Sequence, residues 1–169
     1  GAMAMGNPSD LHPQSPPEEY AVKAAFIYNF AKFVEWPAGT FPDANAPLVI
    51  GVLGADPFGD VLDRTVAGKQ VQGRPLRIKR WNRTRDVEGC QILFVSGSEQ
   101  GSMATILDQF RAAPVLTVSD AEKFDERGGI VGFVMVENKV RFEINNRSAQ
   151  QAGMKISSRL LMLALHVLE

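Results

Sequence analysis

The sequence predicts a three-layer α/β domain built on a mostly parallel sheet of about six strands. Short continuous apolar runs alternate along the chain with segments whose apolar residues have helical spacing, and two strand-like runs near the end are joined by a tight turn. Continuous apolar runs are typical of parallel strands that are covered on both faces. We therefore expect a C-terminal antiparallel hairpin in the sheet, with long first and last helices flanking it.

The first 17 residues differ in composition from the rest of the 169-residue chain. They contain four prolines and few large apolar residues, which predicts a disordered tail. The start, Gly1-Ala2-Met3, resembles a cloning scar. Residues 18–169 are then expected to form one α/β domain, because this length suits a single hydrophobic core.

A long first helix is expected from about Pro17 to Trp36. Proline suits the first helical position, and Glu18 and Glu19 favour the positive end of the helix dipole. Pro37 ends the helix, because the residue before a proline avoids helical dihedral angles. Its apolar stripe comprises Val22, Ala25, Phe26, Phe30 and Phe33.

Strands and helices follow in alternation. Strands are expected at residues 48–53, 75–81, 91–95, 115–118, 130–136 and 139–145. Helices are expected at residues 56–66, 99–110, 121–126 and 146–168. The strand at 139–145 alternates apolar and charged residues, which predicts a solvated edge strand. The last helix would carry Met162 and His166 on its outer face.

Composition and charge exclude several classes of function. The 18 Lys and Arg residues balance 19 Asp and Glu, so the chain lacks the basic surface that nucleic-acid binding needs. No apolar run is long enough for a membrane-spanning helix. The single cysteine, Cys90, cannot form a disulfide within the chain. The two histidines, His12 and His166, make a Cys/His zinc site or a Ser–His–Asp triad improbable. The sequence predicts no catalytic residue, cofactor or metal site.

Two motif-like patterns are weak. Gly51-x-x-Gly54-x-Asp56 follows a strand and precedes a helix, but it lacks the spacing of a dinucleotide-binding loop, so a turn is favoured. A phosphoacceptor receiver domain would need an aspartate where the strand at 91–95 ends, and Ser96 stands there instead.

Polar residues follow two neighbouring strands and suggest a ligand crevice. Ser96 and Ser98 follow one strand, and Ser119 and Asp120 follow the next. The favoured interpretation is helix capping, in which these side chains satisfy backbone N–H groups. The carboxyl ends of strands are also the usual ligand site of open α/β sheets, so a small-molecule sensor is the alternative function. Asn29, a polar residue among the aromatics of the first helix, joins this candidate crevice.

A second set of residues is a candidate protein-binding surface. The aromatics of the first helix are interpreted mainly as core, since aromatic side chains bury large areas. The polar side chains of the strand at 139–145 suit a solvated edge or a recognition strip. The candidate partner-binding residues are Tyr28, Trp36, Arg141, Glu143, Met162 and His166.

An ordered series of short motifs resembles the YfiR-like family. The first is YNFAKFVEWP at residues 28–37. It is followed by GVLG at 51–54, GRPL at 73–76, CQILF at 90–94, SGSE at 96–99, PVLTVSD at 114–120, GGI at 128–130, VRFEIN at 140–145 and AGMKISS at 152–158. The resemblance extends over residues 19–165.

The resemblance implies an exported, periplasmic regulator that is not an enzyme. Its implied partner is the periplasmic part of an inner-membrane diguanylate cyclase, which it represses, lowering cyclic-di-GMP output and biofilm formation. An outer-membrane lipoprotein is a further implied partner, and a homodimer is expected if the regulator matches the symmetry of a dimeric receptor. An export signal would precede Gly1. The single Cys90 departs from the family pattern of several cysteines, so a disulfide switch within the chain does not carry over.

Overall fold

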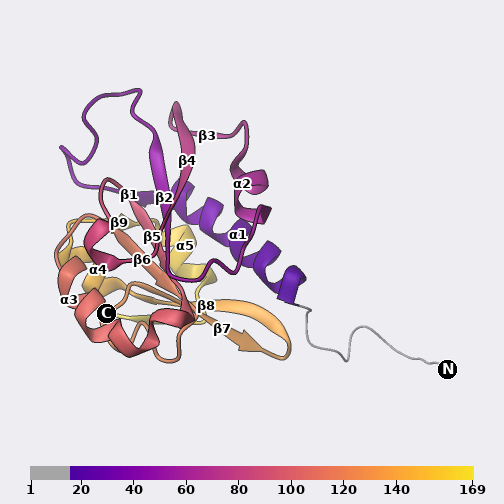
Figure 1. Ribbon diagram of the computed structural model, residues 1–169. Coiled ribbons are helices and arrows are strands. Elements are labelled where there is room, and N and C mark those ends of the chain that lie inside the picture. Colours follow the sequence, from indigo (N-terminus) through magenta and orange to yellow (C-terminus); the bar gives the residue numbers. More distant parts are fainter. Residues whose placement is uncertain (1–15) are drawn as a thin grey trace.

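The computed structural model describes residues 16–169, so the predicted tail lies outside the described residues except for its last two positions. A mostly parallel sheet of eight strands runs through the domain, and helices cover both of its faces (Figure 1). The predicted α/β class and three-layer arrangement are confirmed. The strand order is β10-β8-β7-β6-β5-β2-β4-β3, and a separate two-stranded sheet joins β1 to β9.

The elements have the following bounds. The helices are α1 (Pro16–Phe33), α2 (Val61–Val66), α3 (Met103–Phe110), α4 (Asn146–Gln151) and α5 (Ser158–Leu163), with short 3₁₀ helices at Thr84–Asp86 and Gly97–Ser102. The strands are β1 (Val34–Glu35), β2 (Leu48–Leu53), β3 (Gln70–Val71), β4 (Arg74–Trp81), β5 (Ile92–Val95), β6 (Leu116–Ser119), β7 (Val131–Val136), β8 (Lys139–Asn145), β9 (Lys155–Ile156) and β10 (His166–Leu168).

The central strands are buried on both faces, as their continuous apolar runs predict. In β2, Ile50 and Val52 pack into the core beneath α1 and α2. The intervening Val49 and Leu53 pack into a second core beneath α3. Gly51 lies inside this strand, and a Cβ there would come within 2.4 Å of the Trp81 ring. This glycine therefore permits close packing and has no part in a nucleotide loop.

The aromatic stripe of α1 forms the core against the hairpin. The Phe30 ring lies 5.2 Å from that of Phe142 and 6.0 Å from that of Phe133, measured between centroids. Phe26 contacts the same two rings. The hairpin itself is as predicted: β7 and β8 pair antiparallel across Glu137 and Asn138, which both have positive φ.

The first helix is shorter than predicted at its C-terminal end. It stops at Phe33, and β1 then pairs antiparallel with β9. Trp36 leaves the helix and donates a hydrogen bond from Nε1 to the carbonyl oxygen of Gln91 at 3.1 Å. The pairing partner of β1 lies about 120 residues away in sequence, so no local pattern predicts it.

The prediction of one long last helix over residues 146–168 is wrong. The segment divides into α4, β9, α5 and β10. Gly153 takes a φ of +80°, and the N–H of Met154 donates to the carbonyl oxygen of Ala149, which closes α4 with a glycine C-cap. Ser157 then accepts a hydrogen bond from the N–H of Arg159 and begins α5. The apolar residues of this region therefore keep helical spacing although they belong to two separate helices.

The strand β8 is not the edge of the sheet, contrary to the prediction. The last residues of the chain form β10, which pairs parallel with β8 and aligns His166 with Glu143. β10 is consequently the edge strand, and β8 is paired with β7 on one side and, over residues 143–145, with β10 on the other.

Two predicted helices are interrupted by residues with positive φ. Gly59 has a φ of +58°, so α2 begins at Val61 instead of at Asp56. Lys123 has a φ of +57°, and the segment 121–126 consists of turns. The predicted helix at 99–110 begins as a 3₁₀ helix and becomes α-helical only at Met103.

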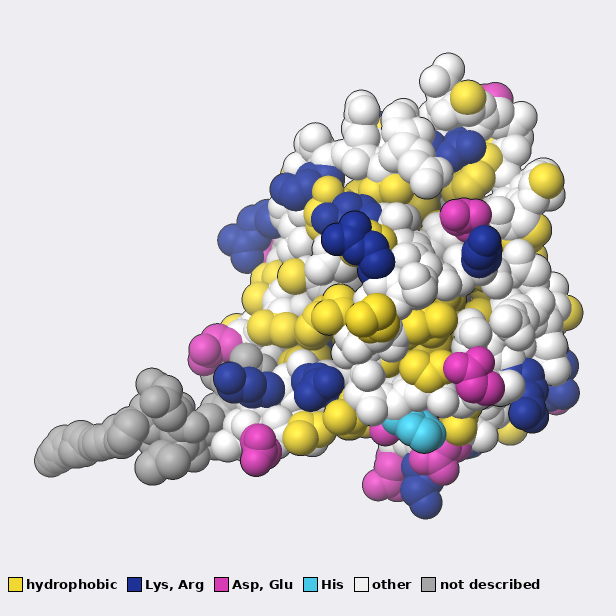
Figure 2. Space-filling model, turned by 180° about the vertical axis from the view of Figure 1, so that it is seen from behind, with side chains coloured by type: hydrophobic (Ala, Val, Ile, Leu, Met, Phe, Trp, Pro, Cys, Tyr) yellow, Lys and Arg dark blue, Asp and Glu magenta, His cyan; other side chains and the backbone are white. Residues whose placement is uncertain are grey.

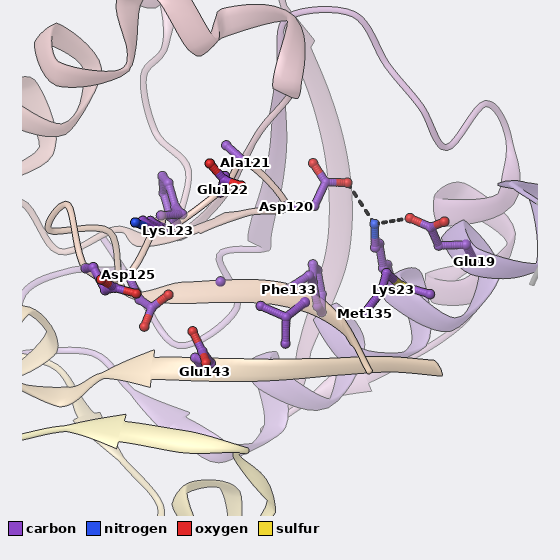
Figure 3. A pocket seen from close by; sticks show the side chains of 14 residues that line it. Glu19, Lys23, Asp120, Ala121, Glu122, Lys123, Asp125, Phe133, Met135 and Glu143 are labelled. Atoms are coloured by element: carbon purple, nitrogen blue, oxygen red, sulfur yellow. Dashed lines mark hydrogen bonds and ion pairs between the residues drawn. The ribbon is translucent and has the colours of Figure 1, made fainter. Parts of the chain in front are cut away.

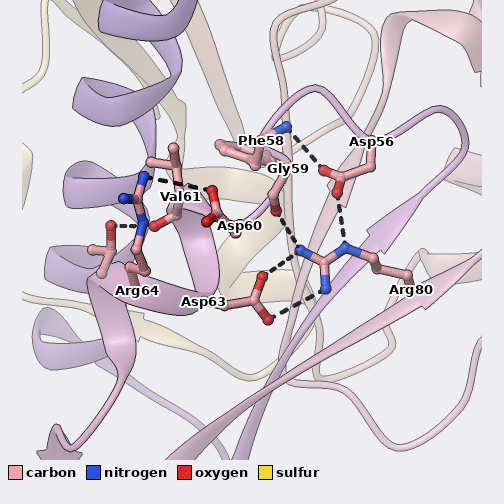
Figure 4. Close-up of polar contacts among 9 residues, drawn as sticks. Asp56, Phe58, Gly59, Asp60, Val61, Asp63, Arg64 and Arg80 are labelled. Carbon is pink, nitrogen blue, oxygen red and sulfur yellow. Dashed lines mark hydrogen bonds and ion pairs between the residues drawn. The ribbon is translucent and has the colours of Figure 1, made fainter.

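Asp56 and Arg80 hold the loop between β2 and α2 in place (Figure 4). Asp56 accepts a hydrogen bond from the N–H of Phe58 at 2.9 Å and one from Arg80 Nε at 2.8 Å. Arg80 also donates to Asp63 Oδ2 at 2.6 Å, and this bond lowers the pKa of Asp63. The three side chains therefore fasten the helix α2 to strand β4.

Cys90 is a buried free thiol, and we expect it to be unreactive in the folded protein. Burial raises the pKa of this thiol to about 12. Since the thiolate is the reactive form, modification by a disulfide reagent at about pH 8 should be at least 100-fold slower for the native than for the denatured chain. Absorbance of the released thiol measures both rates. Equal rates would show that Cys90 is accessible.

Candidate functional site

A cavity of about 500 Å³ opens at the carboxyl end of β6. The register between β6 and β7 aligns Val118 with Val131 and Ser119 with Gly132, and the chain then turns away at Asp120. The segment 120–126 therefore leaves the sheet, and the cavity lies between this segment, strand β7 and the first turns of α1 (Figure 3). This position is the one where open α/β sheets bind ligands.

One end of the cavity carries a buried ion pair. Lys23, only 2% exposed, places its Nζ 2.8 Å from Asp120 Oδ2 and also forms an ion pair with Glu19. Tyr20 donates its hydroxyl to the same Asp120 oxygen at 2.5 Å. Burial raises the pKa of Tyr20, and the hydrogen bond to Asp120 raises it further. These contacts attach α1 to the end of the central strand.

The other end holds two carboxyl groups that face each other (Figure 3). Asp125 is 1% exposed, and its Oδ2 has no hydrogen-bond partner among the described residues. Burial raises the pKa of Glu143, and the neighbouring Asp125 carboxyl raises it further. His166 on the adjacent strand opposes this increase. The Asp125 carboxyl so close by therefore favours the protonated form of Glu143.

The Asp125 carboxyl is held in place by its surroundings. A Cβ at Gly132 would lie 2.7 Å from Asp125 Oδ1, so only glycine allows the carboxyl to approach strand β7 this closely. Asn145 donates from Nδ2 to the carbonyl oxygen of Asp125 at 2.8 Å, while its Oδ1 caps α4 through the N–H of Ser148. One side chain thus positions both the helix and the carboxyl-bearing turn.

The residues predicted for a ligand crevice are divided by the structure. Asp120 lines the cavity. Ser119, directly before it, is fully buried, donates to the carbonyl oxygen of Val95 and accepts from the N–H of Ala121. Ser96 caps the 3₁₀ helix, and Ser98 accepts from the N–H of Ala55 at 2.9 Å. Asn29 is half-buried on α1, away from the cavity lining.

The residues predicted for a partner surface lie in several places. Tyr28 is half-buried beneath Lys32, whose Nζ lies 4.8 Å from the ring centroid. Trp36 is hydrogen-bonded to the carbonyl oxygen of Gln91, just before β5. Glu143 lines the cavity, and Arg141 is half-buried on the same strand. Met162 and His166 lie on α5 and β10, where both are exposed. The structure therefore brings Glu143 and Asp120 to one cavity and aligns His166 with Glu143 on the neighbouring strand.

Asp120 and Glu143 are the residues of the cavity lining that were predicted, and the residues that carry its other polar contacts were not. Glu19 and Lys23 lie on α1, and Asp125 lies in the turn after β6. Lys23 stands three residues before Phe26 and seven before Phe30, so it falls on the apolar stripe of the helix. A lysine on such a stripe requires a buried partner, and this pattern could have indicated the ion pair. No comparable pattern indicates that Asp125 is buried.

Two further searches concern metals and membranes. Within residues 16–169, no three side chains of the His, Cys, Asp and Glu types are grouped so that they could hold a metal ion. Among the helices that the structure describes, none combines the length and apolar character required to cross a membrane.

Comparison with known proteins identifies the family. The sequence profile of the family described as YfiR/HmsC-like matches residues 20–165. The chain belongs to the YfiR/HmsC-like family. The resemblance stated from the short motifs is therefore confirmed over almost the same residues. Proteins of the YfiR/HmsC-like family are signalling regulators.

Solved structures share the fold of this YfiR/HmsC-like chain at low sequence identity. A conserved domain protein of Vibrio cholerae O1 biovar El Tor superposes with a TM-score of 0.57 at 13% identity, covering 88% of this chain and 60% of the other. The ABC domain from Streptococcus pneumoniae, solved in complex with L-Trp, gives a TM-score of 0.52 at 14% identity, covering 72% and 55%. The chain thus spans little more than half the length of either structure. No protein of curated function matches it.

Proposed function

We propose that this chain is a periplasmic regulator that binds the periplasmic part of an inner-membrane diguanylate cyclase and represses it. The supporting observation is the YfiR/HmsC-like match over residues 20–165. Repression requires that the regulator bind the inactive form of the cyclase more tightly than the active form. Its binding then lowers cyclic-di-GMP output and restrains biofilm formation without any catalytic step in the regulator.

An exposed apolar surface on α5 and β10 is the best candidate for the contact. Met162 is 84% exposed, Leu163 60% and Leu165 42%. On this side of the molecule a band of hydrophobic side chains crosses the surface above the histidine (Figure 2). Protein interfaces commonly have an apolar centre and a polar rim, and His166 lies beside the apolar residues to supply part of such a rim. We call Met162, Leu163, Leu165 and His166 the α5 face.

A competing partner on the same face provides a means of release. An outer-membrane lipoprotein that bound the α5 face would exclude the cyclase, because one surface cannot hold two proteins at once. The repression would then depend on the relative affinities and concentrations of the two partners.

The test is binding of the purified chain to the periplasmic domain of a cyclase encoded beside its gene. Changing Met162→Glu places a carboxylate in the centre of the apolar contact, so we expect affinity to fall by at least tenfold, about 1.4 kcal/mol. The matched control is Ala104→Glu, which adds the same charge at an exposed position of α3. Calorimetric titration measures all three proteins.

Two results would contradict the proposal. If the unchanged chain does not bind the cyclase domain, and deletion of its gene leaves cyclic-di-GMP unaltered, the repressor function is wrong. If the Met162→Glu variant binds as tightly as the Ala104→Glu variant, the repressor function can stand but the α5 face is not the contact.

A further inference from the structure

We propose that the cavity beside β7 binds a small organic cation, whose ammonium or guanidinium group contacts the neighbouring carboxyl groups of Asp125 and Glu143. This inference concerns a ligand of the cavity and does not depend on the cyclase being the partner. It rests on the distribution of charge in the cavity, on the buried oxygen of Asp125 and on the apolar wall formed by β7.

The charges in the cavity are neutralised at one end only. Lys23 pairs with both Glu19 and Asp120. At the other end, no Lys, Arg or His of residues 16–169 lies within ion-pair distance of Asp125 or Glu143. Glu122, Lys123 and Glu126 are exposed at the rim, so six acidic and two basic side chains line the cavity in all. A bound cation would therefore find its strongest attraction at the Asp125 end.

The unpartnered oxygen of Asp125 points to a ligand that donates hydrogen bonds. A carboxylate oxygen buried without a donor is costly, and such atoms are rare in folded proteins. Burial and the neighbouring Asp125 carboxyl raise the pKa of Glu143, because two negative charges so close together repel each other. An ammonium group has three N–H donors and a guanidinium has five, so either could neutralise this repulsion and donate hydrogen bonds to both carboxylates.

The rest of the cavity suits an aliphatic ligand better than a metal ion. Phe133, Val134 and Met135 line the wall between the two charged ends. Their side chains can pack against methylene groups, as the stems of lysine and arginine do in proteins. Together with the lack of a metal-type cluster within residues 16–169, this wall favours an alkylamine or alkylguanidine.

The experiment is calorimetric titration of the purified chain with cadaverine and with agmatine, using glutarate as an anion of similar size. We expect at least one of the two cations to bind and glutarate not to bind. The variants Asp125→Asn and Glu143→Gln keep the shape of each side chain and remove one charge, so each should weaken binding by about tenfold or more. Glu122→Gln removes the same charge from the exposed rim and should weaken it by less than about threefold.

Two further measurements separate this site from general charge attraction. Gly132→Ala changes no charge but displaces the Asp125 carboxyl, so it should also weaken binding by about tenfold. Affinity should rise as the pH increases through the raised pKa of Glu143, because a bound cation favours the charged form of this carboxyl. The other groups around this carboxyl are Asp125, Glu126, Arg141 and His166, and a His166→Gln variant should keep the dependence on pH.

The outcomes decide the proposal directly. Lack of binding by both cations overturns it. Equal weakening by Glu122→Gln and Asp125→Asn also overturns it, because the attraction would then come from net charge alone. Asp125→Asn and Glu143→Gln are expected to fold, since each removes one of two mutually repelling groups, and thermal unfolding of the unliganded variants verifies this.

Discussion

Replacing Phe30 by alanine is expected to lower the free energy of unfolding by about 4 kcal/mol, because it removes a fully buried aromatic ring from the centre of the larger core. The ring is 0% exposed and contacts Phe26, Phe133 and Phe142. The neighbouring rings cannot close the gap, since α1 is fixed by the ion pair near its start and by β1 at its end. Denaturant unfolding followed by circular dichroism measures the loss.

Two variants on the same helix test this explanation. Phe30→Leu keeps most of the apolar volume and should lose about 1 kcal/mol. Phe33→Ala changes a half-buried ring and should lose about 1 to 2 kcal/mol. If Phe30→Ala were no more damaging than Phe33→Ala, the aromatic cluster would not be the main contact between α1 and the hairpin.

The parts of the fold that the sequence predicts well are those fixed by local pattern. The continuous run at β2 predicts a buried parallel strand because both faces of that strand are covered, and the alternation in β8 predicts an antiparallel arm. The last segment was mispredicted for a physical reason. Ala149, Ile156 and Leu160 keep helical spacing, yet Gly153 ends α4 between them, and pairing of β9 with β1 then determines the direction of the chain.

The candidate site could be predicted only in part. Asp120 follows a buried strand, and the topology of parallel sheets places such residues at the ligand edge. Lys23 was assigned to the helix without a role, although its place on the apolar stripe requires a partner. Asp125 and Glu143 meet only because the turn after β6 folds over Gly132 of the next strand. Such a contact between neighbouring elements depends on side-chain packing, which residue spacing does not encode.

The buried ion pair of Lys23 carries the other large prediction. Asp120→Ala should lower the free energy of unfolding by about 3 kcal/mol, because it removes one of the two partners of a buried ammonium group. Glu19 continues to neutralise Lys23, which keeps the loss toward the lower end of the range for broken buried pairs. The hydroxyl of Tyr20 also loses its acceptor, which adds to the effect. Chemical denaturation at constant ionic strength gives the value.

The loss of unfolding free energy in Lys23→Met, compared with that in Asp120→Ala, separates two explanations for the role of the ion pair. Methionine is apolar and similar in length, and the carboxylates of Asp120 and Glu19 are each partly exposed to water, so this change should cost at most about 1 kcal/mol. If Asp120→Ala loses much more unfolding free energy than Lys23→Met, the carboxylate is required because a buried ammonium group without a partner is costly. The attraction within the ion pair then contributes little to stability. Equal losses of unfolding free energy would show instead that the attraction between α1 and the end of β6 stabilises the domain directly. Tyr20→Phe would then be expected to lose less unfolding free energy than either variant.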